Sequence, residues 1–86
     1  MQGFDGKLIY ITGGSSGIGL EMGKIFAARG AELLLLARGR ERLLAARQAM
    51  EPLRLRNTQR IGILSVDVAD HRDIQVKMAE ALKDYG

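Results

Sequence analysis

The chain has no cysteine, no tryptophan and a single proline among its 86 residues. Without cysteine it can form neither a disulfide nor a thiolate metal site, and we predict no metal site. Its longest apolar run, residues 33–37, is far shorter than the roughly 18 residues that a membrane-spanning helix needs. The first residues also lack the apolar stretch of a secretory signal. We therefore expect a cytoplasmic protein with no membrane span.

Aromatic residues make up only 5% of the chain, which matters because its middle is basic. Residues 38–60 contain seven arginines and two glutamates, a local charge of +5 in a chain of net charge +3. Surfaces that bind nucleic acid usually interleave such charges with aromatic side chains, so we do not expect a nucleic-acid partner. We expect Arg42, Arg47 and Arg54 on the solvated face of a helix.

The apolar pattern predicts three strands alternating with three helices in one small domain. The strands are expected at residues 8–11, 33–37 and 61–66, and the helices at 18–29, at 41–54 and from about 70 onward. Short connections imply right-handed crossovers and a parallel sheet in the order 3-2-1. The predicted fold class is α/β, a Rossmann-type three-layer arrangement that is half of a doubly wound parallel sheet.

Each predicted helix carries an apolar stripe that should face the sheet. The stripes are Ile18, Met22, Ile25 and Phe26 in the first helix, Leu43, Ala46, Met50 and Leu53 in the second, and Ile74, Met78, Ala81 and Leu82 in the third. Gly30 should cap the end of the first helix, and Pro52 should kink or end the second. Asp70 and Asp73 resemble a capping box at the start of the third.

A glycine-rich turn, residues 12–19, separates the first strand from the first helix. Its glycines at 13, 14, 17 and 19 match neither the G-x-G-x-x-G fingerprint nor a Walker loop. Glycine tolerates positive φ and lets a ligand approach the main chain, so N–H groups at the helix start can bind a pyrophosphate. One alternative is a flexible loop, and another is that the hydroxyls of Thr12 and the two serines only satisfy the turn backbone. The residues predicted to bind the cofactor here are Gly13, Ser15, Ser16, Gly17, Ile18 and Gly19.

The end of the second strand bears on the choice of nucleotide. At this position NAD-binding proteins place a carboxylate against the ribose 2′-hydroxyl. In this chain Ala37 is followed by Arg38, and Arg40 comes two residues later. A guanidinium can bind a 2′-phosphate bidentately, whereas a carboxylate would repel it. Arg38, assisted by Arg40, therefore predicts NADP(H) as the cofactor, the alternative being that these are plain surface arginines.

The spacing Thr-Gly-x-x-x-Gly-x-Gly, matched at Thr12, Gly13, Gly17 and Gly19, resembles the cofactor turn of the short-chain dehydrogenase/reductase family. Asp67-Val68 resembles the pair after the third strand of that family. The resemblance implies that the Asp67 carboxylate contacts the adenine amino group and that Val68 packs on the ring. The competing interpretation is an acid that only precedes a helix. Within the family, the pattern is most similar to reductases of 3-keto groups, such as the 3-ketodihydrosphingosine reductases.

The family's Tyr-x-x-x-Lys pair and Asn-Ala-Gly turn do not occur in the 86 residues, so we assign no catalytic residue. The resemblance implies that residues 1–86 are the N-terminal dinucleotide-binding part of an incomplete oxidoreductase domain. The complete protein would reduce a keto group by hydride transfer, and this chain alone would be inactive. The alternative is a catalytically silent nucleotide-binding or interaction module. Because the first strand would be central in a full sheet, its edge should be exposed here and favour a homo-oligomer, the alternative being a chain that is only marginally folded.

Overall fold

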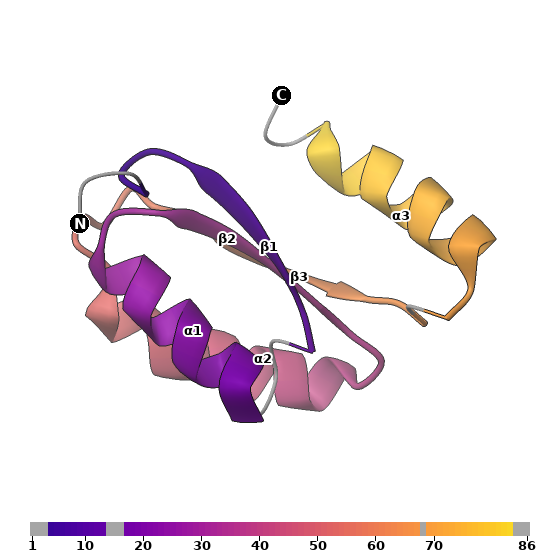
Figure 1. Cartoon of the computed structure of the whole chain (residues 1–86), viewed down its shortest axis with the longest axis horizontal. Helices are drawn as coiled ribbons and strands as arrows, with labels where there is room; N and C mark the ends of the chain where they lie inside the picture. The colour runs from indigo at the N-terminus through magenta and orange to yellow at the C-terminus, as the bar shows by residue number, and fades with distance from the viewer. Residues whose placement is uncertain (1–3, 14–16, 68, 84–86) are drawn as a thin grey trace.

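The computed structural model describes residues 4–13, 17–67 and 69–83. Within these ranges strands and helices alternate along the chain, as the apolar pattern predicts (Figure 1). The elements are β1 (Leu8–Thr12), α1 (Gly17–Ala28), β2 (Glu32–Ala37), α2 (Arg40–Met50), the 3-10 turn η1 (Glu51–Leu53), β3 (Ile61–Ser65) and α3 (His71–Leu82). Each predicted strand and helix is present.

The strands form one parallel sheet with β2 between β1 and β3. Tyr10 of β1 lies beside Leu34 of β2, which lies beside Gly62 of β3. This order confirms the predicted 3-2-1 arrangement and the α/β fold class. It also leaves β1 with one edge that pairs with no strand of the described chain.

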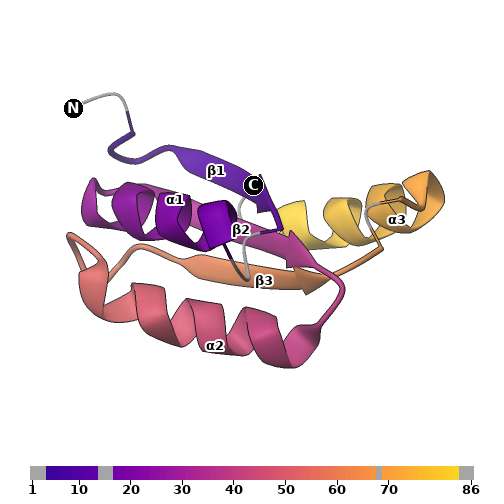
Figure 2. The same cartoon turned by 60° about the horizontal axis from the view of Figure 1, so that its bottom comes forward.

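Helices cover both faces of the sheet, with α1 and α2 on one face and α3 on the other (Figure 2). Leu33 and Leu35 belong to the core under α1 and α2, whereas Leu34 and Leu36 belong to the smaller core under α3. All four are at most 3% exposed. Successive side chains of a strand point to opposite faces, so a central strand covered on both faces is apolar throughout.

The apolar stripe predicted for α1 is mostly exposed, which corrects the expectation. Exposed fractions reach 80% for Ile18, 42% for Met22 and 52% for Ile25, and of this stripe Phe26 alone is half-buried. The helix instead buries Gly23 and Ala27. A Cβ at Gly23 would collide with the terminal methyl group of Met50, so the methionine side chain would have to move to accept a larger residue there. The stripe stays exposed because it extends past β1, the edge strand.

The end of α2 confirms the prediction for Pro52 but not the one for Leu53. The helix stops at Met50, and residues 51–53 form a 3-10 turn with Pro52 near its start. Proline lacks the N–H that a continued α-helix would use, so the change of helix type is the expected effect of Pro52. The tighter turn rotates Leu53 off the buried face, and its side chain is 42% exposed. The predicted inward position of Leu53 is therefore wrong, while Leu43, Ala46 and Met50 are buried.

The two remaining helix boundaries match their sequence signals in part. Gly30, with φ +91°, follows α1 as the predicted cap. Asp70 caps α3 by accepting hydrogen bonds from the main-chain N of Arg72 (3.1 Å) and Asp73 (3.2 Å). The reciprocal half of the capping box is missing, because the Asp73 carboxylate accepts instead from the main-chain N of Asp67 (3.3 Å). Three residues of the predicted α3 stripe, Ile74, Met78 and Ala81, pack against the smaller core that contains Leu34 and Leu36. The Leu82 side chain lies outside the described structure.

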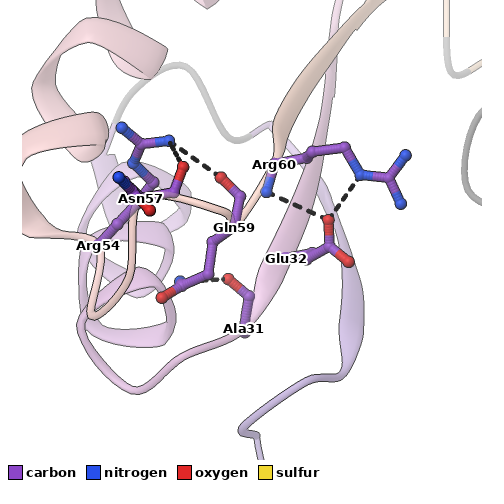
Figure 3. A network of polar contacts seen from close by, with 6 residues as sticks. All are labelled: Ala31, Glu32, Arg54, Asn57, Gln59 and Arg60. Carbon is purple, nitrogen blue, oxygen red and sulfur yellow. Dashed lines mark hydrogen bonds and ion pairs between the residues drawn. The ribbon is translucent and has the colours of Figure 1, made fainter.

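Gln59, in the loop before β3, is the one polar residue buried among the described residues, at 4% exposed. Its Nε2 donates to the main-chain oxygens of Ala27 (2.9 Å) and Ala31 (2.8 Å). Its Oε1 accepts from the main-chain N of Arg56 (2.8 Å). The side chain therefore joins the end of α1, the start of β2 and its own loop; Figure 3 shows it directed at Ala31.

Two arginines complete this polar network at the amino ends of the strands (Figure 3). The Arg54 guanidinium donates to the main-chain oxygens of Glu51, Asn57 and Gln59, so its predicted place on a solvated helix face is wrong. The Arg60 Nε donates to the Glu32 Oε2 at 2.8 Å. That hydrogen bond lowers the pKa of the Glu32 carboxyl below its ordinary value.

Candidate functional site

The carboxyl ends of all three strands meet at one edge of the sheet. Thr12 lies beside Leu36 at the end of β1, and Ala37 lies beside Ser65 at the end of β3. The helices that follow the strands begin on this side (Figure 1). Gly13, Arg38 and Asp67 each come one or two residues after a strand, so the fold brings these three predicted site residues to the same edge.

Two glycines of the predicted phosphate turn adopt the backbone conformation that favours glycine. Gly13 has φ +69° and Gly17 has φ +59°, both in the left-handed region. A Cβ built at either would meet no atom within 4 Å among the described residues beyond its chain neighbours, so conformation rather than crowding accounts for glycine there. The Gly13 N–H donates to the Leu36 oxygen at 2.8 Å and so extends the pairing of β1 with β2. Ser15 and Ser16 lie outside the described residues.

The first turn of α1 is open to solvent on its outer side. Ile18 is 80% exposed and Gly19 is half-buried. Both line a mainly apolar hollow of about 490 Å³ that runs along the free edge of β1. The other residues around it are Ile9, Tyr10, Ile11, Thr12, Met22 and Phe26. The sequence signal for this hollow is the apolar stripe of α1, which we predicted to face inward.

The two arginines predicted to bind a 2′-phosphate are both exposed. Arg38 follows β2 directly, and Arg40 is the first residue of α2. Neither guanidinium makes a hydrogen bond or an ion pair with another described residue. The Arg38 main chain is held, because its oxygen accepts a hydrogen bond from the Ser65 hydroxyl at 2.8 Å. Both cationic side chains are therefore available to an anionic ligand.

Asp67 is half-buried and takes part in the approach to α3. Its Oδ1 accepts from the main-chain N of Ala69 (3.0 Å), and its main-chain oxygen accepts from the N of Asp70 (2.9 Å). These bonds are those of an acid that precedes a helix, the competing interpretation of this residue. Its Oδ2 accepts no hydrogen bond from the described residues, so one carboxylate oxygen can still accept from a ligand. Val68 lies outside the described residues.

No three His, Cys, Asp or Glu side chains of the described chain are grouped as a metal site would require. Each helix in the same described ranges is too short or too polar to cross a bilayer.

Parallel strands joined through helices in this order define the Rossmann-like class of α/β proteins. The chain belongs to the short-chain dehydrogenase family, since the sequence model of that family matches residues 7–86. The comparisons support this family but not the narrower resemblance to 3-ketodihydrosphingosine reductases.

Relatives by sequence and by structure agree on the family. An 11-beta-hydroxysteroid dehydrogenase of Pinus massoniana is 33% identical over 85 residues, which are 99% of this chain and 23% of that protein. L-sorbose reductase from Gluconobacter frateurii, solved with NADPH and L-sorbose, is 33% identical with a TM-score of 0.85, over 99% of this chain and 31% of that one. NAD⁺-bound xylitol dehydrogenase has the same fold, with a TM-score of 0.85 and 24% identity. The match covers 98% of this chain and 31% of that one. The chain thus spans about a quarter of the curated relative's length.

Proposed function

We propose that this chain is the NADP(H)-binding segment of a cytoplasmic short-chain oxidoreductase that reduces a keto group by hydride transfer. The observation that carries the proposal is the placement of Gly13, Arg38 and Asp67 at one edge of the sheet. Bound NADPH would supply the hydride. The residues of this chain would bind and orient the adenosine and pyrophosphate end of the cofactor.

The glycine turn and α1 suit the pyrophosphate. Positive φ at Gly13 and Gly17 bends the chain there, and open space around both glycines lets a ligand reach the main chain. The N–H groups at the start of a helix lack intrahelical partners and carry a partial positive charge. We propose that the N–H groups from residue 15 to Gly19 and the hydroxyls of Ser15 and Ser16 bind the pyrophosphate.

The two arginines suit a 2′-phosphate better than a free 2′-hydroxyl. Both guanidinium groups are exposed and make no ion pair with another described residue, and no carboxylate follows Ala37 directly. In the proposed complex Arg38 binds the 2′-phosphate, Arg40 assists, Asp67 Oδ2 accepts from the adenine amino group, and Val68 packs on the ring. The relative solved with NADPH supports this choice, while the fold by itself is compatible with NAD⁺ as well.

Calorimetric titration of the folded 86-residue chain with NADPH and with NADH tests the proposal. We expect NADPH to bind at least tenfold more tightly, because only NADPH offers the arginines a 2′-phosphate. Circular dichroism before each titration verifies that the chain is folded. No binding of either nucleotide to the folded chain would overturn the proposal, and equal affinity or a preference for NADH would overturn the choice of NADP(H).

We further propose that the isolated chain forms a homo-oligomer through β1. Lys7 and Gly13 use their main-chain groups to pair with β2, so the alternate residues Leu8, Tyr10 and Thr12 direct theirs to the free edge. That edge adjoins the apolar hollow, and such edges recruit further strands. Light scattering after size-exclusion chromatography should give a mass above 9.4 kDa that rises with concentration. A monomer at every concentration would rule this association out.

A further inference from the structure

A chain of polar contacts connects α3 to Arg38 and Asp67. Lys77 Nζ donates to the main-chain oxygen of Ser65 at 2.9 Å and lies 3.4 Å from Asp73 Oδ1. The other Asp73 oxygen accepts from the main-chain N of Asp67 at 3.3 Å. On the other side, the Ser65 hydroxyl donates to the Arg38 main-chain oxygen at 2.8 Å. Lys77 is therefore connected to Arg38 through Ser65 and to Asp67 through Asp73.

The surroundings of Lys77 distinguish it from an ordinary surface lysine. Its side chain is 42% exposed and that of Asp73 is 29% exposed, so part of the ion pair is withdrawn from solvent. Ser65 is half-buried and is held at both its oxygens, one by Lys77 and one by Arg38. Apolar packing fixes how close α3 lies to the sheet, but it is not directional. Hydrogen bonds are directional, so these contacts add to the pairing of Ala37 with Ser65 in holding the ends of β2 and β3 relative to each other.

We propose that Lys77 is a positioning residue for the adenosine end of the dinucleotide site. It acts through Ser65 on the main chain that carries Arg38 and through Asp73 on the main chain that carries Asp67. Lys77 itself contacts no cofactor atom in this proposal. The inference rests on the proposed function, because it assigns a task to Lys77 only if Arg38 and Asp67 bind the nucleotide.

Substitution of Lys77 by methionine removes the ammonium group and keeps the length of the stem. We expect Lys77→Met to weaken binding of 2′,5′-ADP, a probe of the adenosine 2′-phosphate, by about tenfold. Lys77→Arg should restore most of the affinity, because arginine can still donate to Ser65 and pair with Asp73. Lys83→Met is the matched control, since Lys83 is exposed at the far end of α3, and its affinity should stay within about twofold of the unsubstituted chain.

A double-mutant cycle separates positioning from general loss of stability. In an Arg38→Ala background the effect of Lys77→Met on 2′,5′-ADP affinity should fall to about threefold or less, because one of the groups that Lys77 positions is gone. Ser65→Ala should show the same coupling to Arg38 and serves as the second variant if Lys77→Met fails to fold. An unchanged affinity in Lys77→Met, or full additivity with Arg38→Ala, would overturn the positioning role. If the unsubstituted chain does not bind 2′,5′-ADP, the proposed function itself fails.

Discussion

Replacing Gln59 with alanine is expected to lower the free energy of unfolding by about 3 kcal/mol. Three hydrogen bonds disappear, and the main-chain N of Arg56 and the oxygen of Ala31 lose a buried partner. The side chain is 4% exposed, so its removal also leaves a cavity. Small domains have little stability to spare, so a loss of this size brings the chain close to its unfolding threshold.

Urea unfolding followed by circular dichroism measures the effect. Gln48→Ala is the matched control, because Gln48 lies exposed on α2 and its loss should change the free energy of unfolding by no more than about 0.5 kcal/mol. Gln59→Met isolates the polar contribution, since it restores most of the volume without the hydrogen bonds. If Gln59→Met were as stable as the unsubstituted chain, packing rather than hydrogen bonding would account for the role of this residue.

Gln59 lies at the amino ends of the strands, the edge opposite the proposed cofactor site. Its replacement should therefore leave nucleotide affinity per folded molecule unchanged. This separates it from Lys77 and Arg38, whose substitutions are expected to act on affinity.

Replacing Arg38 with aspartate is expected to reverse the preference between the two nucleotides. The affinity for NADPH should fall by about two to three orders of magnitude, because a charge-assisted bidentate contact is lost and a carboxylate then faces the 2′-phosphate. The same carboxylate can accept a hydrogen bond from the ribose 2′-hydroxyl, so NADH binding should be retained or improved. The exposed Arg38 side chain makes no hydrogen bond or ion pair with another described residue, so the stability of the fold should change little.

Calorimetric titrations of this variant need a constant salt concentration, because added ions screen the phosphate contacts. Arg29→Asp is the control for charge. It makes the same change in net charge on an exposed residue beyond the end of α1, at the opposite edge of the sheet. NADPH affinity that fell equally in both variants would indicate a general electrostatic effect and remove the specific role of Arg38.

Local patterns predicted the strands and helices well, because their causes lie within a few residues. The run Leu33–Leu36 could be identified as a central strand since each face of a covered parallel strand must be apolar. Gly30, Pro52 and Asp70 marked helix ends through their own backbone and hydrogen-bonding chemistry. The position of Leu53 could not be predicted, because it depends on whether the helix continues through Pro52 or tightens into a 3-10 turn.

The α1 stripe and Gln59 show why other features were missed. Apolar spacing identifies one side of a helix but not whether a neighbour exists to cover it, and at the edge strand β1 none does among the described residues. Gln59 gave no signal, since a glutamine in a polar loop is usually solvated. It is buried only because the end of α1 and the start of β2 place two carbonyl oxygens within its reach.

By itself, the sequence determined the order of strands and helices, the glycine positions that tolerate positive φ, and the types of side chain that follow each strand. These are properties of neighbouring residues, and short-range sterics and periodicity are sufficient to specify them. Only the tertiary structure decided that Lys77, Asp73 and Ser65 connect Arg38 with Asp67, because pairing β3 with β2 and packing α3 on the sheet bring these segments together. Which distant residues meet depends on that packing, so these contacts are determined only when the sheet and its helices come together.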